Sequence, residues 1–179
     1  MKKYVALLRG INVGGNSVLP MKDLVAIMES IGASAIKTYI QSGNVVFRSA
    51  ATSSMALRES IIATIRQEKG LDVDVLVLTE DGFVKAIDGY PFPVDESSGS
   101  TQHFGFLGKV PSAPDWAKLD VLKAASEQFR VVDSVFYLCA PDGIGRSKLA
   151  AGAEKALGVS MTLRNRNTAV KIRELLASI

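Results

Sequence analysis

Ten residues near the middle of the chain decide how the rest is organised: Pro91-Phe92-Pro93-Val94-Asp95-Glu96-Ser97-Ser98-Gly99-Ser100. Prolines, serines, a glycine and two acidic residues are typical of a linker, because they favour turns and add little to an apolar core. On each side of this stretch, apolar strands and amphipathic helices follow in the same order. The sequence therefore predicts two repeats, residues 1–90 and 101–179, joined by a linker at 91–100.

Apolar periodicity and turn residues predict the same elements in both repeats. In the first repeat they are strands at 3–9, 35–40, 44–48 and 73–78, and helices at 20–31, 53–69 and 79–89. In the second repeat they are strands at 101–108, 128–132, 135–139 and 159–163, and helices from Ser112 (with Asp115 completing a short capping box), at 147–157 and from about 165–168. Both orders are βαββαβα. The predicted fold class is α+β, with two tandem ferredoxin-like βαββαβ units, each an antiparallel sheet with helices on one face.

Composition restricts the kind of protein. With 179 residues and 47% hydrophobic side chains, the chain is long and apolar enough for a buried core. The apolar run near the N-terminus is far too short to span a membrane and lacks a cleavage site, so we expect a cytoplasmic protein with no membrane partner. The net charge is only +3. The region after Gly143 is nevertheless basic, which favours an anionic partner: it has seven cations (Arg146, Lys148, Lys155, Arg164, Arg166, Lys171, Arg173) against two acids (Glu154, Glu174).

Two clusters of donor-rich residues lie where the topology brings loops together. In a βαββαβ unit the loop after strand one and the hairpin between strands two and three share one end of the sheet, and the loop after strand three and the end of strand four share the other. We call the first cluster the first rim: Arg9, Asn12, Gly14, Gly15, Gln41, Ser42 and Asn44. The second rim, in the second repeat, is Arg146, Ser147, Lys148, Arg164, Asn165 and Asn167. Backbone amides and these side chains could hold an anionic or polar ligand, and Arg146, Lys148 and Arg164 are predicted to converge beside helix N-termini.

An ordinary structural role competes with each of these assignments. Gly, Ser and Asn are common in turns and helix caps, which explains each loop about as well as ligand binding does. A phosphate-binding P-loop is excluded because Asn16-Ser17 stands where Lys-Ser is required. A Rossmann site is excluded by the glycine spacing, and no metal-ligand spacing is present. His103 and Cys139 are expected to be structural, and Phe104 and Phe106 are expected to pack in the protein more readily than to stack on RNA bases.

Four segments together resemble the bacterial domain-of-unknown-function family 1697: Tyr4-Val5-Ala6-Leu7-Leu8-Arg9-Gly10-Ile11-Asn12-Val13-Gly14-Gly15, Tyr39-Ile40-Gln41-Ser42-Gly43-Asn44-Val45-Val46-Phe47, Gly143-Ile144-Gly145-Arg146-Ser147-Lys148 and Arg164-Asn165-Arg166-Asn167-Thr168. The resemblance implies a bacterial α+β protein and implies no activity. The family usually has an aromatic residue where this chain has Arg166.

Three functions stay open at this point. The preferred one is binding of a small anionic or polar ligand at the Arg, Asn and Gly-rich loops, with enzymatic activity and cofactor both unassigned. The second is a nucleic-acid-binding protein that uses the sheet face and the basic C-terminal region. The third is an interaction module without a ligand.

Overall fold

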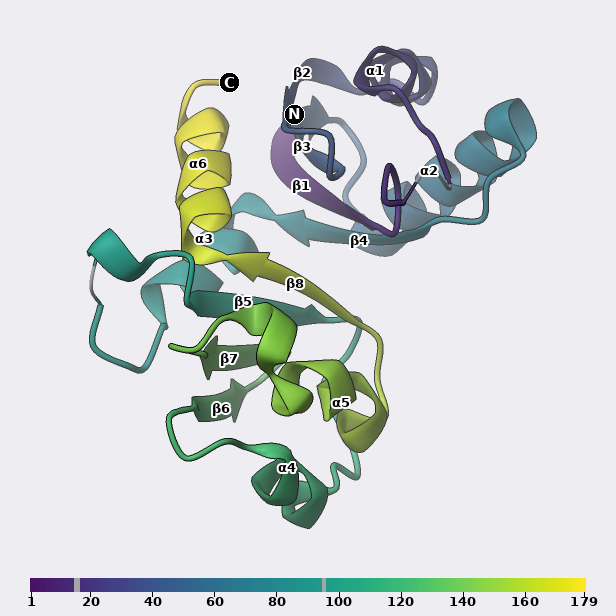
Figure 1. The fold of residues 1–179 in the computed structure, drawn as a ribbon. Helices are drawn as coiled ribbons and strands as arrows, with labels where there is room; N and C mark the ends of the chain where they lie inside the picture. The colour runs from purple at the N-terminus through teal and green to yellow at the C-terminus, as the bar shows by residue number, and fades with distance from the viewer. Residues whose placement is uncertain (15–16, 95) are drawn as a thin grey trace. The chain divides into compact units, whose positions relative to one another are not determined.

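The computed structural model describes residues 1–14, 17–94 and 96–179. Within these residues the protein is α+β, with six α-helices and two four-stranded antiparallel sheets (Figure 1). The two sheets are built from strands that occur in the same order along the chain, as the sequence predicts.

The first sheet contains β1 (Lys2–Arg9), β2 (Ser34–Tyr39), β3 (Asn44–Ser49) and β4 (Asp74–Thr79), in the spatial order β2-β3-β1-β4. Its helices are α1 (Met21–Ser30) and α2 (Ser54–Lys69), and α3 (Glu80–Asp88) follows β4. Local chemistry fixes the ends of α2: the Ser53 hydroxyl accepts a hydrogen bond from the Ala56 amide, and Gly70 ends the helix at φ 64°.

Alternation along the strands gives the first sheet two different faces. Tyr4, Ala6 and Leu8 of β1 belong to one apolar cluster with Val45, Phe47 and the buried residues of α1 and α2, which are Leu24, Ile27, Met28, Leu57, Ile61 and Ile65. This face therefore carries the helices. Val5 and Leu7 point to the other face and are also buried.

The second sheet contains β5 (Gln102–Leu107), β6 (Gln128–Val132), β7 (Val135–Cys139) and β8 (Met161–Asn165), in the order β6-β7-β5-β8. Its helices are α4 (Trp116–Leu122) and α5 (Lys148–Leu157), and α6 (Arg166–Ala177) follows β8; short 3₁₀ segments lie at Glu96–Ser98 and Ile144–Arg146. β1 and β5 hold equivalent places: each is the third strand in its sheet and pairs antiparallel with its two neighbours.

The second sheet also has a helical face and an aromatic face. Leu107, Phe136, Leu138 and Met161 pack in one cluster with α4 and α5. Phe104 and Phe106 alternate to the opposite face and are 0% and 2% exposed, which confirms that they are packed inside the protein. Tyr90 covers this face, with its ring centroid 5.3 Å from that of Phe104.

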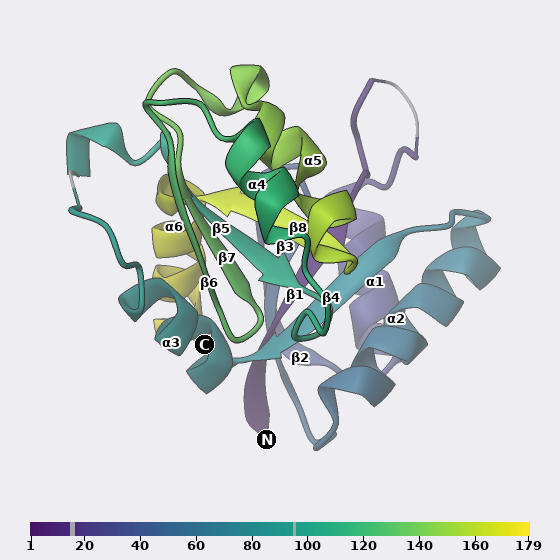
Figure 2. The ribbon, with the colours of Figure 1, turned by 90° about the horizontal axis from the view of Figure 1, so that it is seen from below.

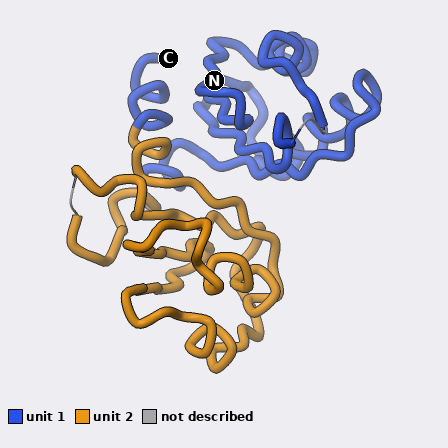
Figure 3. Tube along the Cα trace, in the orientation of Figure 1, with its two compact units in different colours: residues 1–85, 171–179 blue, residues 86–170 orange. Residues whose placement is uncertain are grey.

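The chain divides into two compact units, and the first unit is discontinuous in sequence (Figure 3). Unit 1 contains Met1–Lys85 and Lys171–Ile179, and unit 2 contains Ala86–Val170. Both crossings between the units therefore lie inside helices, in α3 and in α6. The predicted linker at 91–100 lies within unit 2, so packing does not divide the chain at that stretch.

Lysine side chains hold the end of α6 within unit 1. The Lys3 ammonium donates to the Leu176 carbonyl oxygen (2.9 Å) and contacts the Glu80 carboxylate (3.3 Å). The Lys37 ammonium donates to the Ser178 hydroxyl oxygen (2.9 Å). Cations at a helix C-terminus offset its partial negative charge and satisfy carbonyls that lack partners inside the helix.

Two predicted boundaries in the second repeat are wrong. Helix α4 begins at Trp116 instead of near Ser112, and Asp115 itself is the cap, because its carboxylate accepts the Lys118 amide (2.9 Å). Strand β8 runs from Met161 to Asn165 instead of 159–163, because pairing with β5 continues as far as the His103–Asn165 pair. Arg164 is consequently a strand residue, which changes the direction of its side chain.

Candidate functional site

The first rim lies at the end of β1, where the hairpin between β2 and β3 meets the following loop. The Leu8 amide donates to the Gly43 carbonyl oxygen (2.8 Å). The Asn12 carboxamide donates to the Leu19 and Gln41 carbonyl oxygens (2.9 and 2.8 Å) and accepts the Leu19 amide (2.8 Å). The two loops predicted to share one end of the sheet therefore do so, and one side chain connects them.

Most polar groups of the first rim are engaged in holding this turn. Asn44 is 1% exposed, and its carboxamide donates to the Tyr39 carbonyl oxygen (3.1 Å) and the Ser42 hydroxyl oxygen (2.9 Å). Gly43 has φ 75°, and a Cβ atom there would lie 2.6 Å from the Leu8 Cβ, so only glycine fits. These contacts support the structural interpretation of Asn12, Ser42 and Asn44.

The remaining members of the first rim are more open to solvent. The side chains of Arg9 and Gln41 are exposed, as is Gly14, which has φ 61°. Arg9 also takes part in an interaction within the protein. Gly15 lies outside the described residues.

The second rim contains two helix caps. The Ser147 hydroxyl accepts the Ala150 amide at the start of α5 (2.9 Å), and the Asn165 carboxamide oxygen accepts the Thr168 amide in the first turn of α6 (2.9 Å). The Arg166 amide donates to the Gly99 carbonyl oxygen (3.1 Å). Asn167 lies over Gly99, where a Cβ atom would be 2.1 Å from the Asn167 Oδ1. Protein groups therefore already surround the N-terminus of α6.

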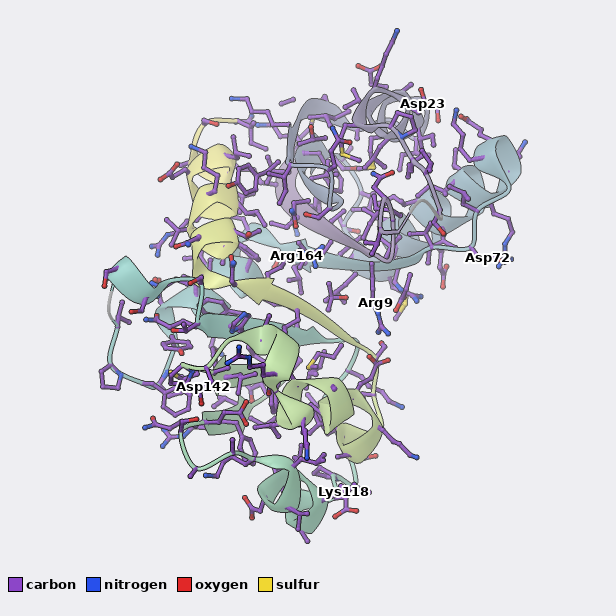
Figure 4. The ribbon with its side chains drawn as sticks, viewed as in Figure 1. Arg9, Asp23, Asp72, Lys118, Asp142 and Arg164 are labelled. Carbon is purple, nitrogen blue, oxygen red and sulfur yellow. The ribbon has the colours of Figure 1, made fainter. Side chains whose placement is uncertain are left out.

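Arg164 does not share the helical face with the start of α5 (Figure 4). It pairs with Phe104 across the strands, so its side chain leaves the sheet on the aromatic face, whereas α5 packs on the other face. Burial lowers the pKa of Arg164 to about 10, and its guanidinium donates to the Leu163 carbonyl oxygen (2.9 Å). The strand register therefore places the Arg164 side chain on the face opposite α5, which argues against the predicted convergence of Arg146, Lys148 and Arg164.

Two backbone amides at the N-terminus of α5 have no acceptor among the residues that the structure describes. Among the described residues, the amides of Lys148 and Leu149 donate to no acceptor. The side chains of Arg146 and Lys148 are exposed, and neither forms an ion pair within the described part of the chain. The carboxylate of the preceding loop, Asp142, accepts the Ser126 hydroxyl (2.6 Å). Two amides and two cations thus gather at one helix end.

His103 and Cys139, the histidine and the cysteine weighed as catalytic groups, both lie in packed surroundings. His103 is 3% exposed, its Nδ1 lies 3.1 Å from the Thr101 carbonyl oxygen, and burial lowers its pKa. Cys139 is half-buried at the end of β7 beside the Tyr90 hydroxyl. Burial raises the pKa of Tyr90, so this hydroxyl stays protonated and donates to the Leu138 carbonyl oxygen (3.3 Å).

Sequence reasoning missed the part played by Tyr90 and Tyr137. The Tyr137 hydroxyl donates to the Ala86 carbonyl oxygen (2.9 Å), and both rings pack against Phe104. The only local signal was a pair of aromatic residues at the predicted linker, Tyr90 just before it and Phe92 within it, which a simple connection would not need.

Neither rim coincides with a hollow on unit 2 that lies at the C-terminal end of α5. Ala151, Glu154, Lys155, Gly158, Val159 and Ser160 line it. No group of three or more His, Cys, Asp or Glu residues in 1–14, 17–94 and 96–179 is arranged to hold a metal ion. Within the same residues, no helix is long and apolar enough to cross a bilayer.

The fold and motifs place the chain in a family. It belongs to DUF1697, a family of proteins of unknown function, whose model matches residues 1–137. Its fold is similar to that of a solved structure, the conserved bacterial protein SP0830 from Streptococcus pneumoniae. The TM-score is 0.69, the sequence identity is 21%, and the match covers 98% of each chain. No curated protein matches the chain.

Proposed function

We propose that this protein binds a small anionic ligand at the N-terminus of α5, through the amides of Lys148 and Leu149 and the side chains of Arg146 and Lys148. The observation that supports the proposal most directly is that these two amides have no acceptor among the described residues. Free amides at a helix N-terminus, together with the helix dipole, favour a negative charge.

The two cations strengthen this interpretation. A positive side chain beside a helix N-terminus opposes the dipole, at a cost of about 0.3–1 kcal/mol. Ion pairs with carboxylates would offset that cost, and Arg146 and Lys148 form none within the described residues. A bound oxyanion would remove the penalty and would gain charge-assisted hydrogen bonds.

The alternatives receive less support. Stacking of nucleic-acid bases on Phe104 and Phe106 requires exposed rings, and both are buried. Capping explains Ser147 and Asn165, so the proposed site is narrower than the second rim. We further infer that both units are ferredoxin-like, which the shared strand orders β2-β3-β1-β4 and β6-β7-β5-β8 support, and that the protein works in the cytoplasm.

A thermal-shift titration with phosphate, sulfate, citrate and nucleotides tests the site. Since each charge-assisted hydrogen bond contributes about 1.5–3 kcal/mol, Arg146→Gln and Lys148→Gln should each weaken binding by about tenfold or more. Lys155→Gln is the matched control, because it removes the same charge near the other end of α5. Equal shifts in wild type and all three variants, or no shift in any protein, would show that the α5 N-terminus binds no anion.

A further inference from the structure

One ring nitrogen of His103 is bonded to the backbone, and the other has no partner among the described residues. The residue is 3% exposed, and its Nδ1 lies 3.1 Å from the Thr101 carbonyl oxygen. Because a carbonyl oxygen only accepts hydrogen bonds, Nδ1 carries the proton, and Nε2 of the neutral ring presents a lone pair. Nε2 is not one of the fully buried, unbonded atoms of the described residues, so the small exposed part of the ring includes it.

Asn165 lies directly across the sheet from His103 and has a donor in the same situation. The two residues are partners in the β5–β8 pairing, so their side chains leave the same face with Cβ atoms about 4.5–5.5 Å apart. The Asn165 Oδ1 accepts the Thr168 amide (2.9 Å), which makes Nδ2 the free end of the carboxamide. Nδ2 has no acceptor within the described part of the chain, and it does not bond to His103. An acceptor and a donor therefore lie side by side, each unbonded.

Both side chains lie on the face of the second sheet that carries the proposed anion site. His103 is on the same side of β5 as Leu107 and pairs with Leu138, and both leucines belong to the apolar cluster beneath α4 and α5. Figure 2 shows these two helices together on one side of the second sheet. Leu149, in the first turn of α5, belongs to the same cluster as Leu138. The start of α5 therefore packs over the part of the face that contains His103.

The loop that leads to α5 is also anchored beside His103 at its other end. The Thr101 carbonyl oxygen, which accepts His103 Nδ1, accepts the Ala140 amide as well (2.8 Å). From Ala140 the chain turns back at once, because the Gly143 amide donates to the Ala140 carbonyl oxygen (3.0 Å). Segment 140–147 is thus fixed near the histidine at both ends, by the shared carbonyl and by the packing of the first turn of α5.

We propose that His103 and Asn165 bind a hydroxyl group of the ligand whose oxyanion lies at the N-terminus of α5, so that this ligand is a hydroxylated organic phosphate or carboxylate. We call His103 and Asn165 the hydroxyl subsite. A hydroxyl group both donates and accepts, so it can donate to Nε2 and accept from Nδ2. A carboxylate would find no donor at Nε2, and an ammonium group would meet the Asn165 donor. The inference rests on the proposed anion site, because the hydroxyl subsite has no charge of its own.

Isothermal titration calorimetry with two pairs of probes tests the hydroxyl subsite: glycerol 3-phosphate against propyl phosphate, and glycerate against propanoate. Each pair shares a carbon skeleton and differs in its hydroxyl groups. The wild type should bind the hydroxylated member about fivefold to tenfold more tightly, in the pair whose oxyanion the site accepts. His103→Phe removes the acceptor, and Asn165→Ser removes the donor while a serine hydroxyl still caps α6. Both variants should lose the preference and bind the member without hydroxyl groups as the wild type does.

Thr162→Val is the matched control, because Thr162 is also a buried polar residue of β8 but lies on the aromatic face, opposite Phe106. It should keep the wild-type preference. Equal affinity for the two members of each pair in the wild type would overturn the hydroxyl subsite and leave the anion site in place. An unchanged preference in Asn165→Ser, which retains its cap, would do the same. Absence of binding of all four probes and of inorganic phosphate would overturn the anion site, and this inference with it.

Discussion

Substitution of Leu176 by alanine should destabilise unit 1, although Leu176 lies only three positions before the last residue of the sequence. Leu176 is 1% exposed near the end of α6, in the segment that returns to unit 1. Removal of a fully buried leucine side chain costs about 2–5 kcal/mol, from lost burial and from the cavity that remains. The hydrogen bond from Lys3 is made to the Leu176 backbone oxygen, so the substitution leaves it in place.

Urea unfolding would measure the size of this effect, and hydrogen exchange followed by mass spectrometry would locate it. Peptides from β1 and β3 should lose protection, whereas peptides from β5 and β7 should keep it. Leu175→Ala, at a half-buried neighbour, should cost clearly less. Loss of protection confined to β5 and β7, or equal in both sheets, would refute the assignment of this segment to unit 1.

Two further predictions concern unit 2. Phe106→Ala should lower the free energy of unfolding by about 3–5 kcal/mol with or without phosphate, because the ring is 2% exposed; a near-neutral change in thermal unfolding would contradict its place in the core. Burial lowers the pKa of folded His103 below 6.5, so between the two pKa values the unfolded chain binds a proton at His103 that the folded chain does not bind. The free energy of unfolding should therefore fall as pH decreases through about 6.5. Urea midpoints at pH about 7.5 and about 5 should differ less in His103→Gln than in wild type; the same difference in both would exclude His103 as the source.

Local sequence signals predicted the order of the elements because those signals act over a few residues. The Ser53 cap and the Gly70 stop each fix a boundary of α2 without distant partners. The end of β8 could not be predicted in this way, since its length follows from pairing with β5 more than fifty positions earlier. For the same reason, the face of the sheet on which the Arg164 side chain lies could not be predicted.

The sequence predicted which polar loops lie together better than it predicted what their side chains do. The loops of the first rim do meet, and Asn12 connects them. Sequence alone could not separate the capping role of Ser147 or Asn165 from ligand binding, because the same donors and acceptors serve both. The Lys148 and Leu149 amides, which have no acceptor within the described part of the chain, could not be recognised from the sequence, because it does not show which donors are already bonded.

The chain passes between the two units twice, once inside α3 and once inside α6, so the units do not follow one another as two continuous stretches of sequence. Since the segments 171–179 and 1–85 both belong to unit 1, no continuous interval of the gene encodes that unit. In a circular permutant that joined Ile179 to Met1 and began at Ala86, residues 86–170 would come first and all of unit 1 would follow as one piece. The permuted chain would cross between the units once, through α6, and the peptide bond given up would lie within α3.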